Sequence, residues 1–552
     1  MYRKLKPKVL KQVIFLSYFL LYFSYAHAQG WKTYPYSPEG SLISFPYDEG
    51  QHPEEAIEWW YTAGHLTGSS SGTQYSYMLS YFYYPAYGFD GFRILNLSND
   101  DTGAFFDETV AVNYKVMAED SLNIVAMTTG GITESWANKT EIDDSMVPFE
   151  YNLSAEGVHG AISLEYISEK PPLILGDDGY FEQGQNSYTY YFSLTKNTVQ
   201  GTLSIAGTTE DVMGTAWIDR QYGSFNPLTE EDYEWFFIQL SNDMDFNIYN
   251  LFTSDRLLPD TATYKHMSVY VDSLTQYTTH DFDVERLSFQ YMADSVRCYA
   301  REWRLSSPQN NVELVISTHH NNSEVELPFR FFEGATTITG TVNGIPVTGK
   351  GFAELLHSYE KPEISVSYPA PESWTSSRPI SWEITNPDDG RPLYYDLAYS
   401  IDDKNTFVTI AQELSVPFFY WTDPPIPDGS NCWFKVIAYS LDSTLANLDI
   451  SSAPSVYDPN LTAISKTSDD ERQKNSIKIY PNPADDWLLL DLDNEFEYVN
   501  YRILDISGKV MMDERITHPQ GIQLNLESIP PGLYIIGLFT GDDAILKKFI
   551  IR

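Results

Sequence analysis

Basic residues and cysteines are both scarce in this chain of 552 residues. Its 35 Lys and Arg face 76 Asp and Glu, which gives a formal net charge of −41 at pH 7. Nucleic acids and anionic membrane surfaces would repel such a chain, so we expect no nucleic-acid partner. The two cysteines, Cys298 and Cys432, lack zinc-type spacing and are expected to be buried as small apolar side chains. We therefore expect no disulfide, no metal site and no cofactor.

Long apolar runs are also missing, with one short exception near the N-terminus. The run from Val13 to Tyr25 is shorter than the roughly 20 residues that a transmembrane helix needs, so we do not expect an integral membrane protein. Five basic residues precede this run, and Ala26-His27-Ala28 follows it. That order predicts a secretory signal peptide over residues 1–28, cleaved after Ala28. Cleavage would remove no acidic residue and would lower the net charge to −46.

Helical periodicity is equally hard to find, and short alternating strands take its place. Aromatic residues make up 15% of the chain, and residues 75–83 alternate between polar and aromatic or apolar side chains. Residues 336–347 have the pattern of a hairpin whose two-residue turn is Asn343-Gly344. We predict an all-β chain.

Changes of composition along the chain predict its domain boundaries. Residues 29–360 are rich in Trp and Tyr, and a seam near Phe225–Pro227 divides them into domains 29–225 and 226–360. Residues 361–457 carry short strands at the regular spacing of a small sandwich. Residues 458–476 are polar and aperiodic, which is typical of a linker, and residues 477–552 are expected to form a compact β unit.

The C-terminal unit carries four motifs in a fixed order. They are Ile479-Tyr480-Pro481-Asn482-Pro483, the run 503–509 (ILDISGK), the run 529–535 (IPPGLYI) and the basic-apolar end 547–552 (KKFIIR). With these motifs, residues 477–552 resemble the type A sorting domain of the type IX secretion system, known from Bacteroidetes. The resemblance implies the type IX machinery as a partner, and a route through the periplasm to the outside of the cell or its outer surface. A generic adhesive β-sandwich could supply some of the same motifs.

A second ordered series of motifs covers about residues 40–359. It comprises Glu58-Trp59-Trp60-Tyr61, Gly64-His65-Leu66, the run 214–222 (GTAWIDRQY), Tyr233-Glu234-Trp235, Phe332-Glu333-Gly334 and the run 351–355 (GFAEL). This series resembles the family of carotenoid 1,2-hydratases and AttH-like proteins, which implies two lipocalin-like β-barrels. Residues 361–457 resemble a fibronectin type III or immunoglobulin-type module, which implies a spacer or adhesion unit. The expected fold is therefore two barrels, a sandwich and a small C-terminal β-sandwich.

One strand of this series places an acid beside a large aromatic face. Side chains alternate along a strand, so Trp217, Asp219 and Gln221 share one face, and Ile218 and Arg220 share the other. If the Asp219 face points into the barrel, its carboxyl is desolvated among indole rings, and burial raises the pKa of a carboxyl. Asp219 is therefore a candidate general acid. The alternative is that it pairs with a basic residue on a neighbouring strand or caps a turn.

The family resemblance implies a reaction on an apolar, unsaturated terpenoid or lipid: hydration of an isolated carbon–carbon double bond through a carbocation, or an acid-assisted hydrolysis. We predict Asp219, Glu58 and Gln221 as catalytic residues, with Gln221 orienting water in place of the acid expected there in many relatives. The predicted ligand-binding residues are Trp59, Trp60, Tyr61, His65, Trp217, Trp235 and Glu333, whose aromatic members could stabilise a cation. Two alternatives stay open: a non-catalytic binder of a hydrophobic ligand, and a surface adhesin.

Overall fold

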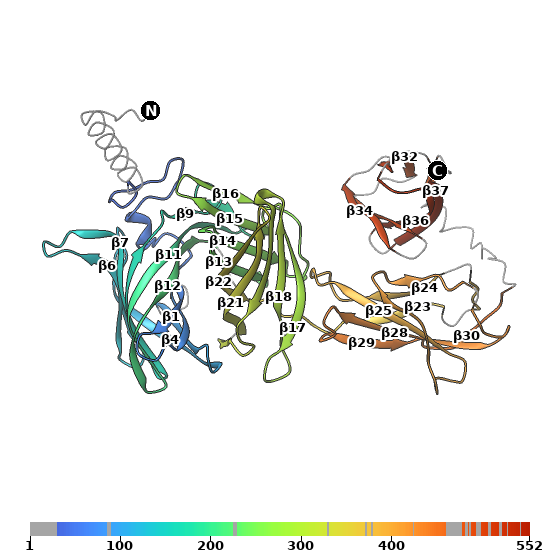
Figure 1. Cartoon of the computed structure of the whole chain (residues 1–552), viewed down its shortest axis with the longest axis horizontal. Coiled ribbons are helices and arrows are strands. Elements are labelled where there is room, and N and C mark those ends of the chain that lie inside the picture. Colours follow the sequence, from blue (N-terminus) through green and yellow to red (C-terminus); the bar gives the residue numbers. More distant parts are fainter. Residues whose placement is uncertain are drawn as a thin grey trace, which may run out of the picture. The chain divides into compact units, whose positions relative to one another are not determined.

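The structure is a computed structural model that describes residues 30–84, 90–224, 229–327, 330–369, 373–376, 379–422, 424–459 and, with short gaps, 477–551. The predicted signal peptide, the seam near Phe225–Pro227 and nearly all of the predicted linker lie outside the described residues. Internal contacts divide the chain into two units, residues 1–360 with 387–392 and residues 361–386 with 393–552. Strands dominate both units (Figure 1).

The first unit begins with an antiparallel sheet that closes into a barrel. Ten of its strands form a circle in the order β11-β12-β1-β2-β3-β4-β5-β6-β7-β8, and β8 pairs with β11 to close it. The register of β11 shifts between Leu194 and Asn197, so one half of this long strand pairs with β9 and β10 and the other with β8. The strands are β1 (Ile57–Gly68), β2 (Gln74–Tyr83), β3 (Gly91–Asn99), β4 (Ala104–Met117), β5 (Asn123–Thr128), β6 (Thr133–Thr140), β7 (Met146–Gly157), β8 (Gly160–Ser168), β9 (Leu173–Ile174), β10 (Tyr180–Glu182), β11 (Tyr188–Ile205) and β12 (Thr208–Gly223); a short 3-10 helix, η1 (Tyr47–Glu49), precedes them.

The interior of this barrel is filled by side chains. Trp60, Trp136, Phe192 and Ile218 belong to one buried apolar cluster there. The cavity that their side chains help to line measures about 10 Å³, which is room for no more than one water molecule. This cavity therefore has no room for a ligand of terpenoid or lipid size.

The second sheet of the first unit is a half-barrel. Its strands follow the order β16-β15-β14-β13-β22-β21-β19-β18-β17, with β20 added beside β21. Within the described residues the two end strands of this path do not pair, so this sheet stays open. The strands are β13 (Asp232–Leu240), β14 (Asp245–Phe252), β15 (Lys265–Asp272), β16 (Thr275–Thr279), β17 (Asp283–Tyr291), β18 (Cys298–Ser307), β19 (Val312–Thr318), β20 (Glu324–Glu326), β21 (Arg330–Val342) and β22 (Ile345–Leu355), with a 3-10 turn η4 (Gln309–Asn311) between β18 and β19.

The hairpin predicted from Asn343-Gly344 joins β21 to β22. Val342 pairs with Ile345, and the two turn residues have φ angles of 51° and 74°. Two successive positive φ angles are what the common two-residue hairpin turn requires, and Asn-Gly meets that need at low cost. The register of both strands follows from this turn.

The second unit contains two pairs of smaller sheets. In the first pair, β23 (Ile364–Tyr368), β24 (Ile380–Ile384) and β27 (Phe418–Phe419) form one sheet, and β25 (Leu393–Ser400), β26 (Val408–Leu414), β28 (Asn431–Ser440), β29 (Ala446–Ile450) and β30 (Ser455–Val456) form the other. In the second pair, β31 (Ile477–Tyr480), β32 (Trp487–Leu492) and β35 (Ile522–Asn525) form one sheet, and β33 (Tyr498–Asp505), β34 (Val510–Thr517), β36 (Gly532–Thr540) and β37 (Asp543–Ile551) the other. Each pair has its own buried apolar cluster.

The predicted fold class is confirmed, with the second barrel being open. In the described part of the chain, no helix has both the length and the apolar character needed to cross a membrane. Cys298 and Cys432 are buried free thiols, as the sequence predicts.

Candidate functional site

The candidate site lies between the closed barrel and the half-barrel, where one face of each sheet meets the other; we call this region the junction. Trp217 of β12 stacks on Phe237 of β13 with ring centroids 4.8 Å apart, and both belong to an apolar cluster shared by the two sheets. The strands that supply this face lie side by side in Figure 1. The junction, unlike the barrel interior, is the place where both sheets contribute side chains to one buried cluster.

Asp219 faces the junction and not the barrel interior. The alternation predicted for its strand holds, because Trp217 belongs to the junction cluster while Ile218 belongs to the barrel core. The sequence hypothesis made burial of Asp219 depend on an inward-facing side chain. Its orientation is the opposite, yet Asp219 is only 2% exposed, because the second sheet covers it.

Three neutral donors hold the Asp219 carboxyl. Ser193 Oγ donates to Oδ1 at 2.5 Å, Trp217 Nε1 donates to Oδ1 at 2.7 Å, and Tyr191 OH donates to Oδ2 at 2.9 Å. No ion pair among the described residues includes Asp219, so the alternative of a basic partner finds no support there. Burial raises the pKa of Asp219 to about 7, although these three hydrogen bonds lower it in part. Near neutral pH the Asp219 carboxyl is therefore protonated in part of the molecules and ionised in the rest.

A relay of hydrogen bonds joins Asp219 to the second sheet. Trp235 Nε1 donates to Asn247 Oδ1 at 3.0 Å, and Asn247 Nδ2 donates to Tyr191 OH at 3.0 Å. Tyr191 OH accepts this hydrogen bond from Asn247, which leaves its own proton to be donated to Asp219. Gln221, predicted to orient water, instead donates to Gln183 Oε1 at 3.1 Å and is buried.

Two glutamates face the junction from the second sheet. Tyr61 OH of β1 donates to Glu333 Oε1 at 2.9 Å, and Tyr233 OH donates to Glu354 Oε1. Glu333 and Glu354 are direct partners across β21 and β22. Burial raises the pKa of both carboxyls, and the proximity of Glu354 raises that of Glu333 further.

Glu58 lies away from this group. Its carboxylate forms a buried ion pair with Arg220 on the barrel side of the strands. The Arg220 guanidinium also lies over the Trp60 ring, 3.9 Å from its centroid. Glu58 and Trp60 thus share a face, as the alternation predicts, but that face belongs to the barrel core and not to the junction.

The other predicted ligand residues do reach the junction. Tyr61, Trp217 and Trp235 are buried members of its cluster, and Trp59 packs against it half-buried. His65 is buried beside Phe352 with ring centroids 5.3 Å apart, and its Nε2 lies 3.2 Å from the Gly351 carbonyl. Burial lowers the pKa of His65 to about 3, so this imidazole is neutral at physiological pH.

Five further residues belong to the site but were not predicted. Two of them, Tyr233 and Glu354, stand in the recognised motifs, where alternation from Trp235 and Phe352 would have placed them on the same face. The other three lie on strands without a recognised motif, and no signal in the sequence singles them out. The five residues are Tyr191, Ser193, Tyr233, Asn247 and Glu354.

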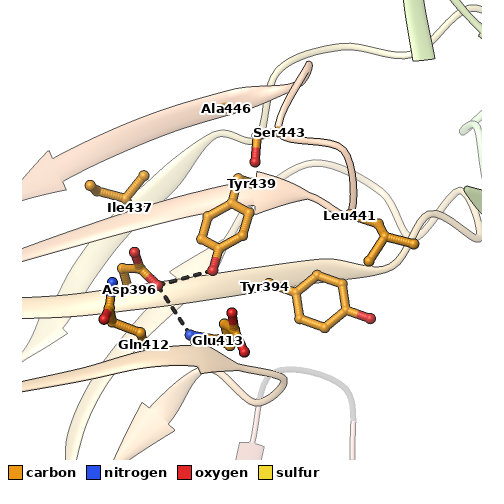
Figure 2. A pocket seen from close by; sticks show the side chains of 9 residues that line it. All are labelled: Tyr394, Asp396, Gln412, Glu413, Ile437, Tyr439, Leu441, Ser443 and Ala446. Carbon is orange, nitrogen blue, oxygen red and sulfur yellow. Dashed lines mark hydrogen bonds between the residues drawn. The ribbon is translucent and has the colours of Figure 1, made fainter. Parts of the chain in front are cut away.

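A separate pocket of about 650 Å³ lies on the second unit, on the face formed by β25, β26, β28 and β29 (Figure 2). The Tyr394 and Tyr439 rings lie side by side in it, with centroids 6.3 Å apart. Tyr439 OH donates to Asp396 Oδ1 at 2.9 Å, and the Glu413 amide donates to the same oxygen at 3.1 Å. No catalytic combination of side chains lines this pocket among the described residues, and its aromatic and acidic walls suit binding.

Comparison with known proteins gives two family matches. A model described as AttH-like matches residues 36–359, and a secretion system C-terminal sorting domain matches residues 478–552. Similar solved structures include an AttH protein of Nitrosomonas europaea, at 19% identity over 58% of this chain and 99% of that chain, with a TM-score of 0.48. Kievitone hydratase of Nectria haematococca matches at 17% identity over 58% of this chain and 98% of that chain, with a TM-score of 0.45. No curated protein matches the chain.

Proposed function

This chain belongs to the AttH-like family and is a secreted or cell-surface protein, and we propose that it adds water to a double bond of an apolar substrate held in its junction. The observation that carries this proposal is the buried Asp219 carboxyl, which has three neutral hydrogen-bond donors and a pKa of about 7. A carboxyl that is protonated in part at neutral pH is suited to general-acid catalysis.

In this proposal Asp219 gives its proton to one carbon of the double bond. The π electrons form the new C–H bond, and the neighbouring carbon becomes a cation. Ser193, Trp217 and Tyr191 then stabilise the carboxylate that remains, because all three are already oriented as donors to it. The Trp235 and Tyr61 rings meet edge to face at 81°, with centroids 5.4 Å apart, and in this proposal a ring face of the pair stabilises the cation. Water then adds to the cation to give an alcohol.

The test compares wild type with Asp219→Asn on two neutral probes, kievitone and the acyclic carotenoid lycopene. Wild type should yield a product heavier by one water, detected by mass spectrometry, and Asp219→Asn should not. Asp211→Asn is the matched control, because Asp211 is exposed on the same strand. Equal turnover by wild type and Asp219→Asn would remove Asp219 from the mechanism.

A non-catalytic binder of a hydrophobic ligand would give a different result. Both wild type and Asp219→Asn would then retain the probe, measured by quenching of tryptophan fluorescence, and neither would convert it. Lipid extraction of the purified protein followed by mass spectrometry would reveal a resident ligand. No product from either protein, together with a bound and unmodified lipid, would favour this binder over the enzyme.

The pocket on the second unit favours an additional adhesive role. Two tyrosine rings beside Asp396 and Glu413 offer a cation both π faces and negative charge. If the chain adheres through this pocket, Tyr394→Ala should weaken its binding to immobilised alkylammonium groups, while Tyr47→Ala, at an exposed tyrosine outside the pocket, should not. Equal binding by both variants would remove the pocket from any adhesive role.

Export is proposed to begin at the signal peptide of residues 1–28 and to end with the type IX machinery of a bacterium of the Bacteroidetes type. A reporter fused to residues 458–552 and given a signal peptide should reach the medium or the cell surface in a competent host. Retention of the reporter in the periplasm would contradict the route.

A further inference from the structure

The two junction glutamates face each other across a single pair of strands. Glu333 of β21 and Glu354 of β22 are direct register partners. Side chains at such positions project to the same face, with Cβ atoms roughly 4.5–5.5 Å apart. The neighbours of Glu333 on that face, Phe331 and Ala335, belong to the junction cluster, as does Phe352 beside Glu354. Two carboxylates at this spacing repel each other unless a proton lies between them.

The hydrogen bonds of the pair leave one oxygen for such a proton. Tyr61 satisfies Oε1 of Glu333, and Tyr233 satisfies Oε1 of Glu354. Glu333 is only 1% exposed, and its Oε2 has no hydrogen-bond partner in the described structure when both carboxyls are taken as ionised. A proton held by either carboxyl would form a hydrogen bond between Glu333 Oε2 and the carboxyl of Glu354.

In the described part of the chain, no ion pair includes Glu333 or Glu354, so no positive charge there compensates the pair. The titratable groups that act on the pair from the packed strands are acids: Tyr61 of β1, Asp219 of β12, Tyr233 of β13 and Tyr249 of β14. Double ionisation would therefore place the buried Glu333 carboxylate beside a second negative charge without any counter-charge, which is strongly unfavourable.

We propose that Glu333 and Glu354 form a carboxyl dyad that shares one proton, and that this dyad is the base that takes the proton of the attacking water. The base role rests on the proposed function, whereas the shared proton does not. Glu354 is half-buried while Glu333 is buried, so the dyad extends from the dry junction towards solvent, where water can enter. Gln221 stands where a second acid was expected, and in this proposal Glu333 and Glu354 of the second sheet supply that acid instead.

The proton balance of the reaction closes with these groups alone. Asp219 loses its proton to carbon, and the oxygen of water forms the new C–O bond with the carbocation. The O–H bond of that water breaks, and its proton goes to the ionised oxygen of the dyad. The dyad then holds two protons and Asp219 none, and one proton returns from the dyad to Asp219 through solvent before the next cycle.

The shared proton is tested in the free protein by infrared spectroscopy of glutamate labelled with ¹³C at the side-chain carboxyl, which excludes the signal of Asp219. At pH 8, wild type minus Glu333→Gln and wild type minus Glu354→Gln should each show a change in the same protonated-carboxyl band, by a shift or by loss. The shared proton lies between the two carboxyls, so replacing either one changes the hydrogen bond that sets the position of this band. Glu326→Gln, with a side chain 67% exposed, is the control and should leave the band unchanged. A band whose position and intensity are unchanged in either variant would overturn the dyad.

The base role is tested by kinetics on a probe that wild type converts. Glu354→Gln should lower kcat by about 100-fold or more with KM changed less than about twofold, since general-base catalysis contributes about that factor. The acidic limb of the pH profile, set by ionisation of the dyad, should disappear, and the alkaline limb set by Asp219 should remain. An unchanged kcat would overturn the base role. If wild type converts no probe, the proposed function and the base role fail together, and the infrared result alone decides the dyad. Circular dichroism and thermal melting identify a variant that fails to fold, in which case the other glutamine variant decides.

Discussion

Replacing Asp219 by Asn should change how the stability of the protein depends on pH. Burial raises the pKa of Asp219 from 3.8 to about 7, so between these values the folded protein holds a proton that the unfolded chain has released. Stability from this proton is fully present below about pH 4 and is lost as pH rises through 7. One pKa unit corresponds to about 1.36 kcal/mol, so the whole loss amounts to about 4 kcal/mol. Between pH 5 and pH 8 the loss is about 2.5 kcal/mol.

The assay is urea unfolding followed by tryptophan fluorescence, with wild type and Asp219→Asn measured at pH 5, 6, 7 and 8. The side-chain amide of the variant does not titrate, so the stability of wild type relative to the variant should fall by about 2.5 kcal/mol across this range. The variant also carries a constant penalty of about 1–3 kcal/mol, because its amide faces three donors. Only the change with pH is therefore diagnostic. Parallel curves for the two proteins would show that Asp219 is ionised throughout, and the proposed acid would be refuted.

Three other substitutions test the arrangement around the site. Glu58→Gln should destabilise the protein by about 3–5 kcal/mol, measured by urea unfolding, because it leaves Arg220 buried without its partner. A retained kcat in the folded variant would confirm that Glu58 stabilises the barrel core, whereas a lost kcat would return Glu58 to the mechanism. Gly351→Ala should prevent proper pairing of β22 with β13, because a Cβ there would lie 1.9 Å from the Phe237 carbonyl oxygen; a melting temperature equal to that of wild type would contradict this packing. Trp217→Phe removes one donor from Asp219 and should raise its pKa, so the alkaline limb of any turnover profile should move to higher pH; an unmoved limb would show that this hydrogen bond is not made in solution.

Much of the site could be predicted from alternation along single strands. The pattern of residues 217–221 gives the face shared by Trp217 and Asp219, and the Asn343-Gly344 turn gives the register of its hairpin. Equal steps outward from that turn lead to Glu333 on one strand and Glu354 on the other, so even the glutamate pair was within reach of the sequence.

What alternation cannot give is which face of a strand is covered, and by what. Asp219 was expected to be buried inside a barrel, but the barrel interior is filled by Trp60, Trp136 and their neighbours, and Asp219 is buried by a second sheet distant in sequence. The same limit explains Glu58, whose motif is recognisable although its side chain lies on the barrel side. Tyr191, Ser193 and Asn247 come from strands whose residues carry no distinctive pattern, and only the pairing of the sheets brings them to Asp219.

The most direct measurement of the central claim is conversion of kievitone or lycopene in ¹⁸O-labelled water by wild type and by Asp219→Asn, with products analysed by mass spectrometry. Wild type should give an alcohol that carries one heavy oxygen, and Asp219→Asn should leave the probe unchanged while still binding it. A heavy alcohol formed equally by both proteins, or probe that binds but is never converted by wild type, would contradict the assignment of the junction as a site of acid-assisted hydration.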